Sequence, residues 1–226
     1  MFTSLTVSLN CAGAGRRLGL SRTKALVGVM GRPLIHWQLD MLEEVRDLRI
    51  VVGYQAADVI NAVTARRPDA VFVFNHAYAS TATGDRLLLA ADHAHARILS
   101  LDGDLLVHPA SMRRLLAEQT NVIGVLPVTT DLPVCVTVDP ADSSIATGFS
   151  QDRRTEWEWS GVVNCSSQIL LAAGKQTTAP RHVFHLLERT LPLGIVAIDA
   201  REIDTVDDYT RAQDWLAVHQ NAGTWS

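Results

Sequence analysis

One stretch decides the fold, and it reads Leu5-Thr6-Val7-Ser8-Leu9-Asn10-Cys11-Ala12-Gly13-Ala14-Gly15-Arg16-Arg17-Leu18. Residues 5–9 are a short apolar run with β-branched side chains, and they lead straight into a turn that holds two glycines. A run of this kind predicts a buried strand, and the glycines predict a loop after it. We therefore expect a strand whose carboxyl end carries a glycine-rich loop.

Helix and strand patterns alternate after this loop. An amphipathic helix is predicted over 33–45, followed by a nearly continuous apolar strand over 48–52 that should be buried on both faces. The same alternation continues with helices over 56–65, 84–94 and 110–119 and strands over 70–74 and 96–101. Such alternation indicates right-handed βαβ units and a mostly parallel sheet.

The pattern changes from position 121 onward. Strand-like segments follow one another without long helices between them, at 122–128, 134–138, 145–149 and 159–164. A helix over 180–191, a strand over 194–198 and a closing helix over 205–218 complete the pattern. The expected fold is α/β and Rossmann-like, with a mostly parallel central sheet flanked by helices and a small mixed or antiparallel extension.

Composition excludes several classes of protein. The 226 residues suffice for one large domain, and 47% hydrophobic with 19% charged residues is typical of a globular chain. A net charge of -4 gives no general attraction to nucleic acid. The three cysteines lack metal-ligand spacing, and no apolar stretch is long enough to span a membrane. We expect a cytoplasmic protein that binds neither nucleic acid nor membrane.

The glycine loop has the composition of a phosphate-binding loop. The backbone N–H groups of residues 12–15 could approach a triphosphate closely, and the cations Arg16 and Lys24 could neutralise charge on a leaving pyrophosphate. The loop matches neither the dinucleotide fingerprint nor the P-loop. A Gly-x-Gly by itself is a weak signal, and a simple tight turn is the alternative.

The wider stretch 9–39 resembles the signature of the sugar-phosphate and phosphocholine nucleotidyltransferases, which have a GT-A-like fold. The matching segments are Ala12-Gly13-Ala14-Gly15-Arg16-Arg17-Leu18, Thr23-Lys24-Ala25-Leu26 and Gly31-Arg32-Pro33-Leu34-Ile35. The resemblance implies that Ala12, Gly13, Ala14 and Gly15 wrap an NTP, that Arg16 (with Arg17 as the alternative) binds phosphate, and that Lys24 is the phosphate-binding lysine. The family commonly has Ala-Ala where Asn10-Cys11 stands, and Pro where Thr23 stands.

Two acidic segments complete the expected chemistry. Leu101-Asp102-Gly103-Asp104 ends an apolar strand, at the edge where open α/β sheets bind ligands. Mg²⁺ takes hard oxygen ligands, commonly one or two carboxylates with substrate phosphates. The segment 202–208 resembles the family's Ile-Asp-Thr segment, which implies that Asp104 and Asp204 are the metal ligands and that Asp102 contacts the nucleotide. The alternatives are a strand-end cap for Asp102 and a helix N-cap for Asp204.

The loop 75–84 is rich in hydroxyl groups. By resemblance to the phosphocholine cytidylyltransferases, it is expected to contact the nucleobase through Ser80, Thr81 and Thr83. The alternative is an ordinary polar loop that caps the following helix, and Asp85 stands where the family often has serine.

The connection 151–161 combines two arginines with two tryptophans. Arg153 and Arg154 could hold an anionic acceptor, and Trp157 and Trp159 could face a quaternary ammonium group. A partly exposed hairpin with its tryptophans in the core is the alternative.

Together these features predict a Mg²⁺-dependent cytidylyltransferase. It would transfer CMP from CTP to phosphocholine or a small phosphonic acid and release pyrophosphate. The expected single domain over 1–226 has an NTP-binding half (1–120), an acceptor-binding half (121–200) and a metal-ligand segment with the last helix (201–226). Three alternatives stay open: a sugar-1-phosphate nucleotidyltransferase, a GT-A glycosyltransferase that uses Asp102-Gly103-Asp104, and an inactive nucleotide-binding domain. A homodimer also stays open.

Overall fold

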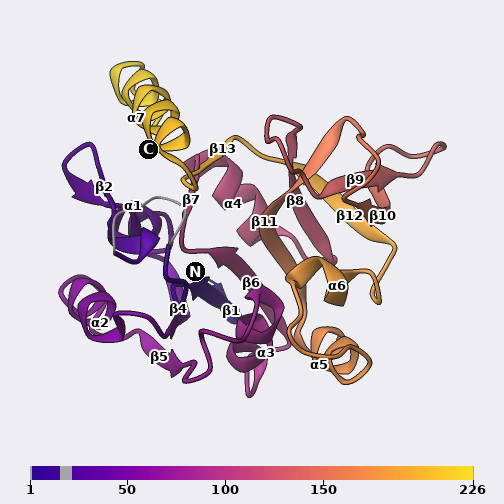
Figure 1. The fold of residues 1–226 in the computed structure, drawn as a ribbon, viewed down its shortest axis with the longest axis horizontal. Helices are drawn as coiled ribbons and strands as arrows, with labels where there is room; N and C mark the ends of the chain where they lie inside the picture. Colours follow the sequence, from indigo (N-terminus) through magenta and orange to yellow (C-terminus); the bar gives the residue numbers. More distant parts are fainter. Residues whose placement is uncertain (1, 16–21, 226) are drawn as a thin grey trace.

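The computed structural model describes residues 2–15 and 22–225. In this described part, a nine-stranded sheet runs through the molecule (Figure 1). Its strands, in spatial order, are β5 (Val71–Phe74), β4 (Val45–Val52), β1 (Phe2–Asn10), β6 (Arg97–Asp102), β11 (Trp157–Ser166), β8 (Val122–Pro127), β12 (Leu193–Ala197), β10 (Ile145–Ser150) and β9 (Cys135–Val138).

Strand direction divides this sheet into two halves. The strands β5, β4, β1 and β6 are parallel, and their register places Asn10 of β1 opposite Asp102 of β6. Beyond them, β11 and β10 are antiparallel to both of their neighbours in the sheet, while β12 is parallel to β8. The mostly parallel sheet with a mixed extension is therefore confirmed.

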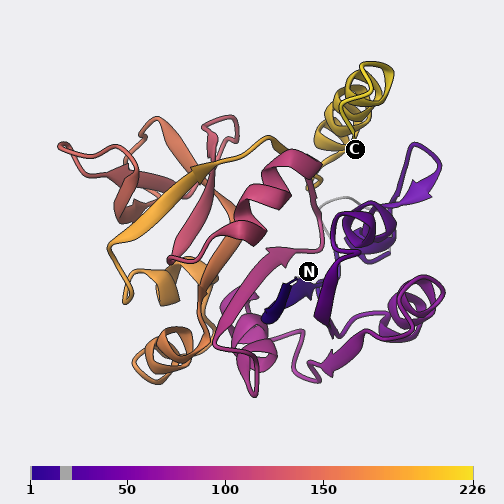
Figure 2. The ribbon, with the colours of Figure 1, turned by 180° about the vertical axis from the view of Figure 1, so that it is seen from behind.

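Helices cover both faces of the sheet. One face packs against α1 (Leu34–Met41), α2 (Ala56–Thr64) and α4 (Pro109–Ala117), and α4 lies in front of the sheet in Figure 2. The other face packs against α3 (Thr83–Ala91), α5 (Ser167–Lys175) and α6 (Val183–Leu187). Side chains alternate along the strands, so Leu48 and Ile50 of β4 join the first core and Val51 joins the second.

A third, smaller core holds the C-terminal helix α7 (Val206–Asn221). Here β7 (Leu105–Val107) pairs with β13 (Ala200–Glu202), and the short strands β2 (Gly28–Val29) and β3 (Arg32–Pro33) form a second ribbon. The core buries Leu106 and Ile203 against Trp215 and Leu216 of α7. The last helix is thereby fixed beside the carboxyl end of β6.

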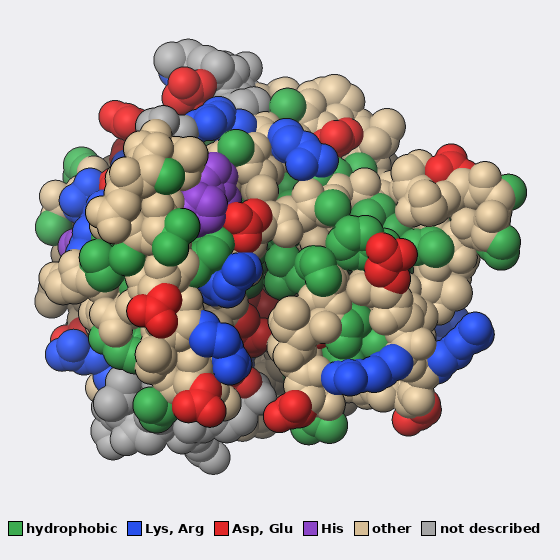
Figure 3. All heavy atoms as spheres, turned by 90° about the horizontal axis from the view of Figure 1, so that it is seen from above, with side chains coloured by type: hydrophobic (Ala, Val, Ile, Leu, Met, Phe, Trp, Pro, Cys, Tyr) green, Lys and Arg blue, Asp and Glu red, His purple; other side chains and the backbone are tan. Residues whose placement is uncertain are grey.

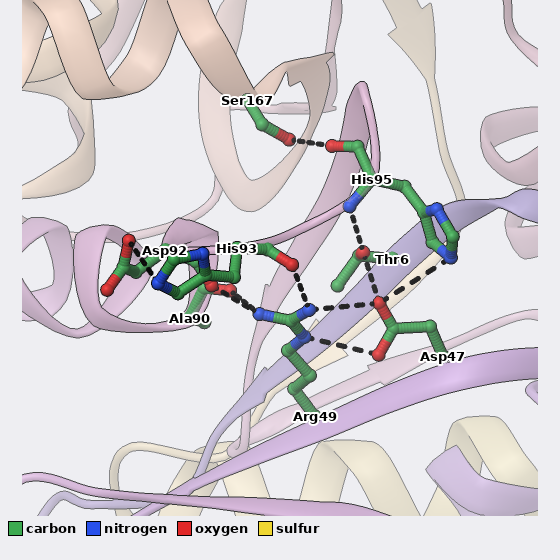
Figure 4. Close-up of polar contacts among 8 residues, drawn as sticks. All are labelled: Thr6, Asp47, Arg49, Ala90, Asp92, His93, His95 and Ser167. Carbon is green, nitrogen blue, oxygen red and sulfur yellow. Dashed lines mark hydrogen bonds and ion pairs between the residues drawn. The ribbon is translucent and has the colours of Figure 1, made fainter.

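A polar cluster beside β1 and β4 fixes the C-terminal end of α3 (Figure 4). Arg49 of β4 donates hydrogen bonds of 2.6–2.9 Å to three carbonyl oxygens at the end of α3, those of Ala90, Asp92 and His93. Its Nε lies 3.1 Å from Asp47, which accepts a 2.5 Å hydrogen bond from Thr6. Helix-end carbonyls that lack helical partners are thus satisfied, and α3 is held in one position along the sheet.

Two predicted boundaries were wrong. The helix expected over 33–45 ends at Met41, because Val45 is buried in the first core as the first residue of β4. The helix expected over 180–191 is only α6, whereas α5 was not predicted at all. Helix α5 begins where Ser166, the last residue of β11, caps it by accepting a hydrogen bond from the backbone N–H of Ile169.

No helix in residues 2–15 and 22–225 is long and apolar enough to cross a bilayer.

Candidate active site

A lysine and two aspartates meet at the carboxyl edge of the sheet. The Lys24 Nζ lies 2.7 Å from the Asp104 Oδ2 and also pairs with the Asp204 Oδ1. These side chains are only 13%, 19% and 14% exposed, respectively, so water screens their charges weakly. Seen from above, the surface is hollowed between the two halves of the molecule, with acidic side chains inside the hollow (Figure 3). Three segments far apart in sequence therefore place the predicted cation beside both predicted metal ligands.

The tight β6–β7 turn positions Asp104. Buried Gln38 of α1 donates hydrogen bonds to the carbonyl oxygens of Asp102 (2.9 Å) and Leu105 (2.8 Å), on either side of the turn. Gly103 donates its N–H to the Asn10 carbonyl at 3.1 Å. A Cβ at Gly103 would lie 2.9 Å from the same carbonyl oxygen, so only glycine allows this close approach.

The β7–β13 pairing positions Asp204. The N–H of Ile203 donates to the Asp104 carbonyl at 2.9 Å, and the Ile203 side chain is fully buried in the third core. The N-cap of α7 is Thr205, which forms a capping box with Asp208. Because the capping position belongs to Thr205, the Asp204 carboxylate faces the site instead.

A long-range hydrogen bond and a close approach to Gly15 position Lys24 at the start of a 3-10 turn (Lys24–Leu26). The N–H of the preceding Thr23 donates to the Gln55 side chain at 2.8 Å. Gly15 has a φ of 58°, and a Cβ there would lie 3.0 Å from the Lys24 Cγ. The second glycine of the loop is therefore required both for its left-handed backbone and for the close approach of the lysine.

A third carboxylate, Glu202, was not predicted from the sequence. Carboxylate oxygens of Asp104, Glu202 and Asp204 all lie within 4.8 Å of one another. Although part of the Glu202 side chain reaches solvent, desolvation of its carboxyl group and the charges of Asp104 and Asp204 raise its pKa to about 8. The signal was its position two residues before Asp204, because residues i and i+2 of an extended chain point to the same side.

Electrostatics ties the lysine to the carboxylates. Burial alone would lower the pKa of Lys24, but the charges and hydrogen bonds of Asp104 and Asp204 raise it above its ordinary value, so the lysine is protonated. Burial, and then the charge of Asp104, raise the pKa of Asp102 to about 7. Asp102 accepts a 3.2 Å hydrogen bond from Asn10, which places it at the strand end, beside β1.

The donor set fits a hard divalent cation. The three clustered carboxylates offer only oxygen atoms, the ligands that Mg²⁺ prefers. Lys24 supplies one positive charge against up to three negative ones, so the cluster can accept further positive charge.

The predicted base-contacting hydroxyls hold their own loop together. Ser80 and Thr81 donate to the Ala77 carbonyl at 3.2 and 3.0 Å, and Thr83 accepts from the N–H of Val183 at 3.3 Å. These bonds are the ones expected of a loop that closes and positions a helix. A base contact for these three residues stays a prediction, as it does for Ala12, Gly13 and Ala14 of the glycine loop. Arg16 and Arg17 lie outside the described residues.

The predicted acceptor residues differ in their exposure to solvent. Arg153 and Arg154 are exposed on the β10–β11 connection, where Arg154 donates to the Thr130 carbonyl at 2.8 Å. Trp157 and Trp159 of β11 are half-buried against the second core. The arginines are therefore accessible to a ligand, whereas much of each indole packs within the fold.

Comparison with known proteins adds an independent line of evidence. The MobA-like NTP transferase domain matches residues 10–137, more than half of the chain, including Lys24 and Asp104. No curated protein matches the sequence. Asp204 lies beyond the matched range, so its part in the site depends on the structure.

Solved structures show the same fold. The CTP:phosphocholine cytidylyltransferase LicC from Streptococcus pneumoniae is 20% identical, with a TM-score of 0.78 over 94% of this chain and 99% of that one. The inositol-1-phosphate CTP transferase from T. maritima is 16% identical, with a TM-score of 0.77 over 92% of each chain. A UDP-glucose pyrophosphorylase is 12% identical, with a TM-score of 0.74 over 94% of this chain and 98% of that one. The family match, on a fold shared with these enzymes, shows that this chain belongs to the MobA-like NTP transferases and is a nucleotidyltransferase.

Proposed function

We propose that this nucleotidyltransferase is a Mg²⁺-dependent cytidylyltransferase that transfers CMP from CTP to a small phosphate or phosphonate acceptor. The observation that carries the proposal is the contact of Lys24 with both Asp104 and Asp204. A protonated lysine beside clustered carboxylates suits a reaction in which a metal-bound, highly charged triphosphate loses pyrophosphate.

The proposed reaction is a direct in-line displacement. An oxygen of the acceptor attacks the α-phosphorus of CTP, the bond from the α-phosphorus to the bridging oxygen breaks, and pyrophosphate leaves with that oxygen. The acceptor oxygen is already ionised near neutral pH, so no general base is needed. Lys24, the backbone N–H groups of residues 12–15 and Arg16 would stabilise the developing charge.

Asp104 and Asp204 would hold the metal, with Glu202 close enough to assist. When bound, Mg²⁺ supplies charge stabilisation at the phosphate oxygens. The protein's own part is to fix the carboxylates, through the Gln38 hydrogen bonds and the β7–β13 pairing.

Two lines of support favour CTP and a small acceptor. The loop 75–84 resembles the nucleobase loop of the phosphocholine cytidylyltransferases, and two enzymes of the same fold are named for CTP and for phosphocholine or inositol 1-phosphate. The exposed pair Arg153 and Arg154 favours an acceptor with an additional anionic group, such as a small phosphonic acid, over phosphocholine.

The test is pyrophosphate release from each of CTP, UTP, GTP and ATP with Mg²⁺, against phosphocholine, sugar 1-phosphates and small phosphonates. We expect release with CTP and one small acceptor, and its loss in Asp104→Asn. Efficient release with a sugar 1-phosphate and another NTP would contradict the CTP and acceptor assignments. Release by Asp104→Asn at the normal rate would contradict the assigned site.

A further inference from the structure

A second cation, Arg86 of α3, lies against the glycine loop. Its Nη1 is 3.5 Å from the position that a Cβ on Gly13 would occupy. At Gly15 the neighbour is the Cγ of Lys24, 3.0 Å from the position of a Cβ, so a cationic side chain lies beside each of the two glycines.

The hydrogen-bonding capacity of Arg86 is largely unused within the described residues. Its Nη2 makes one contact of 3.5 Å with the Thr81 carbonyl, at the limit of a hydrogen bond, and its Nε is buried without a partner. A guanidinium carries five N–H donors, and buried donors without acceptors are costly. Arg49 of β4, by contrast, donates to three carbonyls and to Asp47. The Nη1 and the weakly bonded Nη2 of Arg86 are therefore the donors that a ligand could use, whereas the Nε is buried.

The position of Arg86 indicates which part of a nucleotide it would meet. Lys24 and the carboxylates mark the triphosphate end of the loop, at Gly15. A nucleotide laid along the loop with its phosphates at that end would place its nucleoside near Gly13 and Thr81. Arg86 lies beside both residues, with its Nη1 facing the open Cβ side of Gly13 and its Nη2 3.5 Å from the Thr81 carbonyl oxygen.

We infer that Arg86 reads the base, donating hydrogen bonds to the adjacent acceptors O2 and N3 of cytosine. This inference rests on the proposed cytidylyltransferase function. A guanidinium offers donors only, so it fits two neighbouring acceptors and opposes the N3–H of uracil. Adenine presents an acceptor beside a donor. Guanine offers the acceptor pair O6 and N7, so GTP is the competitor that a test must include.

The experiment compares the wild-type protein with Arg86→Gln and Arg86→Lys. Arg66→Gln serves as the matched control, because Arg66 is an exposed arginine that pairs with Asp40 on α1. The readouts are the Kd values of CTP, UTP and GTP without acceptor, the ratio of kcat/KM for CTP to that for UTP, and the thermal unfolding temperature. A wild-type preference for CTP over UTP is expected, together with a loss of about tenfold or more of that preference in Arg86→Gln. Arg86→Lys should keep part of the preference.

Different failures have different meanings. Equal weakening of all three nucleotides in Arg86→Gln, with a lower unfolding temperature, would overturn the inference in favour of a role in supporting the loop. A wild-type preference for UTP or GTP would also overturn it, while nucleotidyl transfer itself would stand. Absence of pyrophosphate release with any acceptor would instead defeat the proposed function, and the Kd values would still decide whether Arg86 distinguishes the bases.

Discussion

At the scale of single residues, Lys24 has two carboxylate partners whose negative charges it partly neutralises. The lysine is held between Asp104 and Asp204 by hydrogen bonds as well as by charge. In the proposed reaction, a cation would compete with the lysine for the two carboxylates, and the phosphates of the nucleotide would compete with the carboxylates for the lysine. The site therefore carries its own counter-charge before any ligand arrives, which lowers the cost of clustering carboxylates.

Gly103 gives the sharpest prediction at this scale. Gly103→Ala would place a methyl group 2.9 Å from the Asn10 carbonyl oxygen, which belongs to the backbone of the buried strand β1. The turn that carries Asp104 would have to shift, so we expect a loss of stability of about 1–3 kcal/mol together with reduced activity. Gly28→Ala is the control, since nothing lies within 4 Å of its added Cβ. Urea unfolding of both variants measures the difference, and equal stabilities would contradict the account of the turn.

At the scale of elements, helix α7 follows directly after Asp204 and is anchored by a cluster of aromatic and histidine side chains. The ring centroids of His108, the N-cap residue of α4, and His219 of α7 lie 4.5 Å apart. Trp215 and Trp225 pack around these two rings. His219 and Trp215 both contact Asp199, at 3.1 and 3.0 Å. The start of α7, and with it Asp204, is held in place by this packing and by the β7–β13 ribbon.

The cluster predicts a dependence of stability on pH. Burial, and then the charge of His219, lower the pKa of His108 below its ordinary value of 6.5, with Arg113 acting in the same direction and Asp199 opposing it. The imidazole of His108 therefore binds fewer protons in the folded state than in the unfolded state. The stability that the neutral imidazole contributes is present above the pKa of the unfolded state and is lost as the pH falls through that pKa. We expect unfolding experiments between roughly pH 7.5 and 5.5 to show a smaller loss of stability in His108→Gln than in the wild type. His93→Gln, at an exposed position, should behave as the wild type, and identical pH slopes in all three would contradict the prediction.

At the scale of the whole molecule, the sequence was informative where the signal is local. The apolar runs of β1, β4 and β6 and the alternation of strands and helices were sufficient to predict the parallel half of the sheet. Val45 was misassigned to a helix because its apolar spacing suits α1 as well as β4, and only burial against the core decides between them. The β7–β13 pairing joins segments about a hundred residues apart through backbone hydrogen bonds that no single-sequence pattern records.

The candidate site was predictable to a similar extent. Lys24, Asp104 and Asp204 were identified by resemblance, and the structure brings them together. Glu202 was missed because its role depends on the strand partner of β13, and Arg86 was missed because it lies inside a helix with no motif of its own. Contacts that depend on tertiary packing were thus beyond the sequence.

Asp204 lies outside the matched family segment, and we propose that it completes the nucleotidyl-transfer site. The measurement is the rate of Mg²⁺-dependent pyrophosphate release for Asp204→Asn beside Asp207→Asn, the same substitution at an exposed position in the first turn of α7. We predict that Asp204→Asn loses activity by about a hundredfold or more while it stays folded, and that Asp207→Asn keeps its activity. Equal activities in the two variants would contradict the claim.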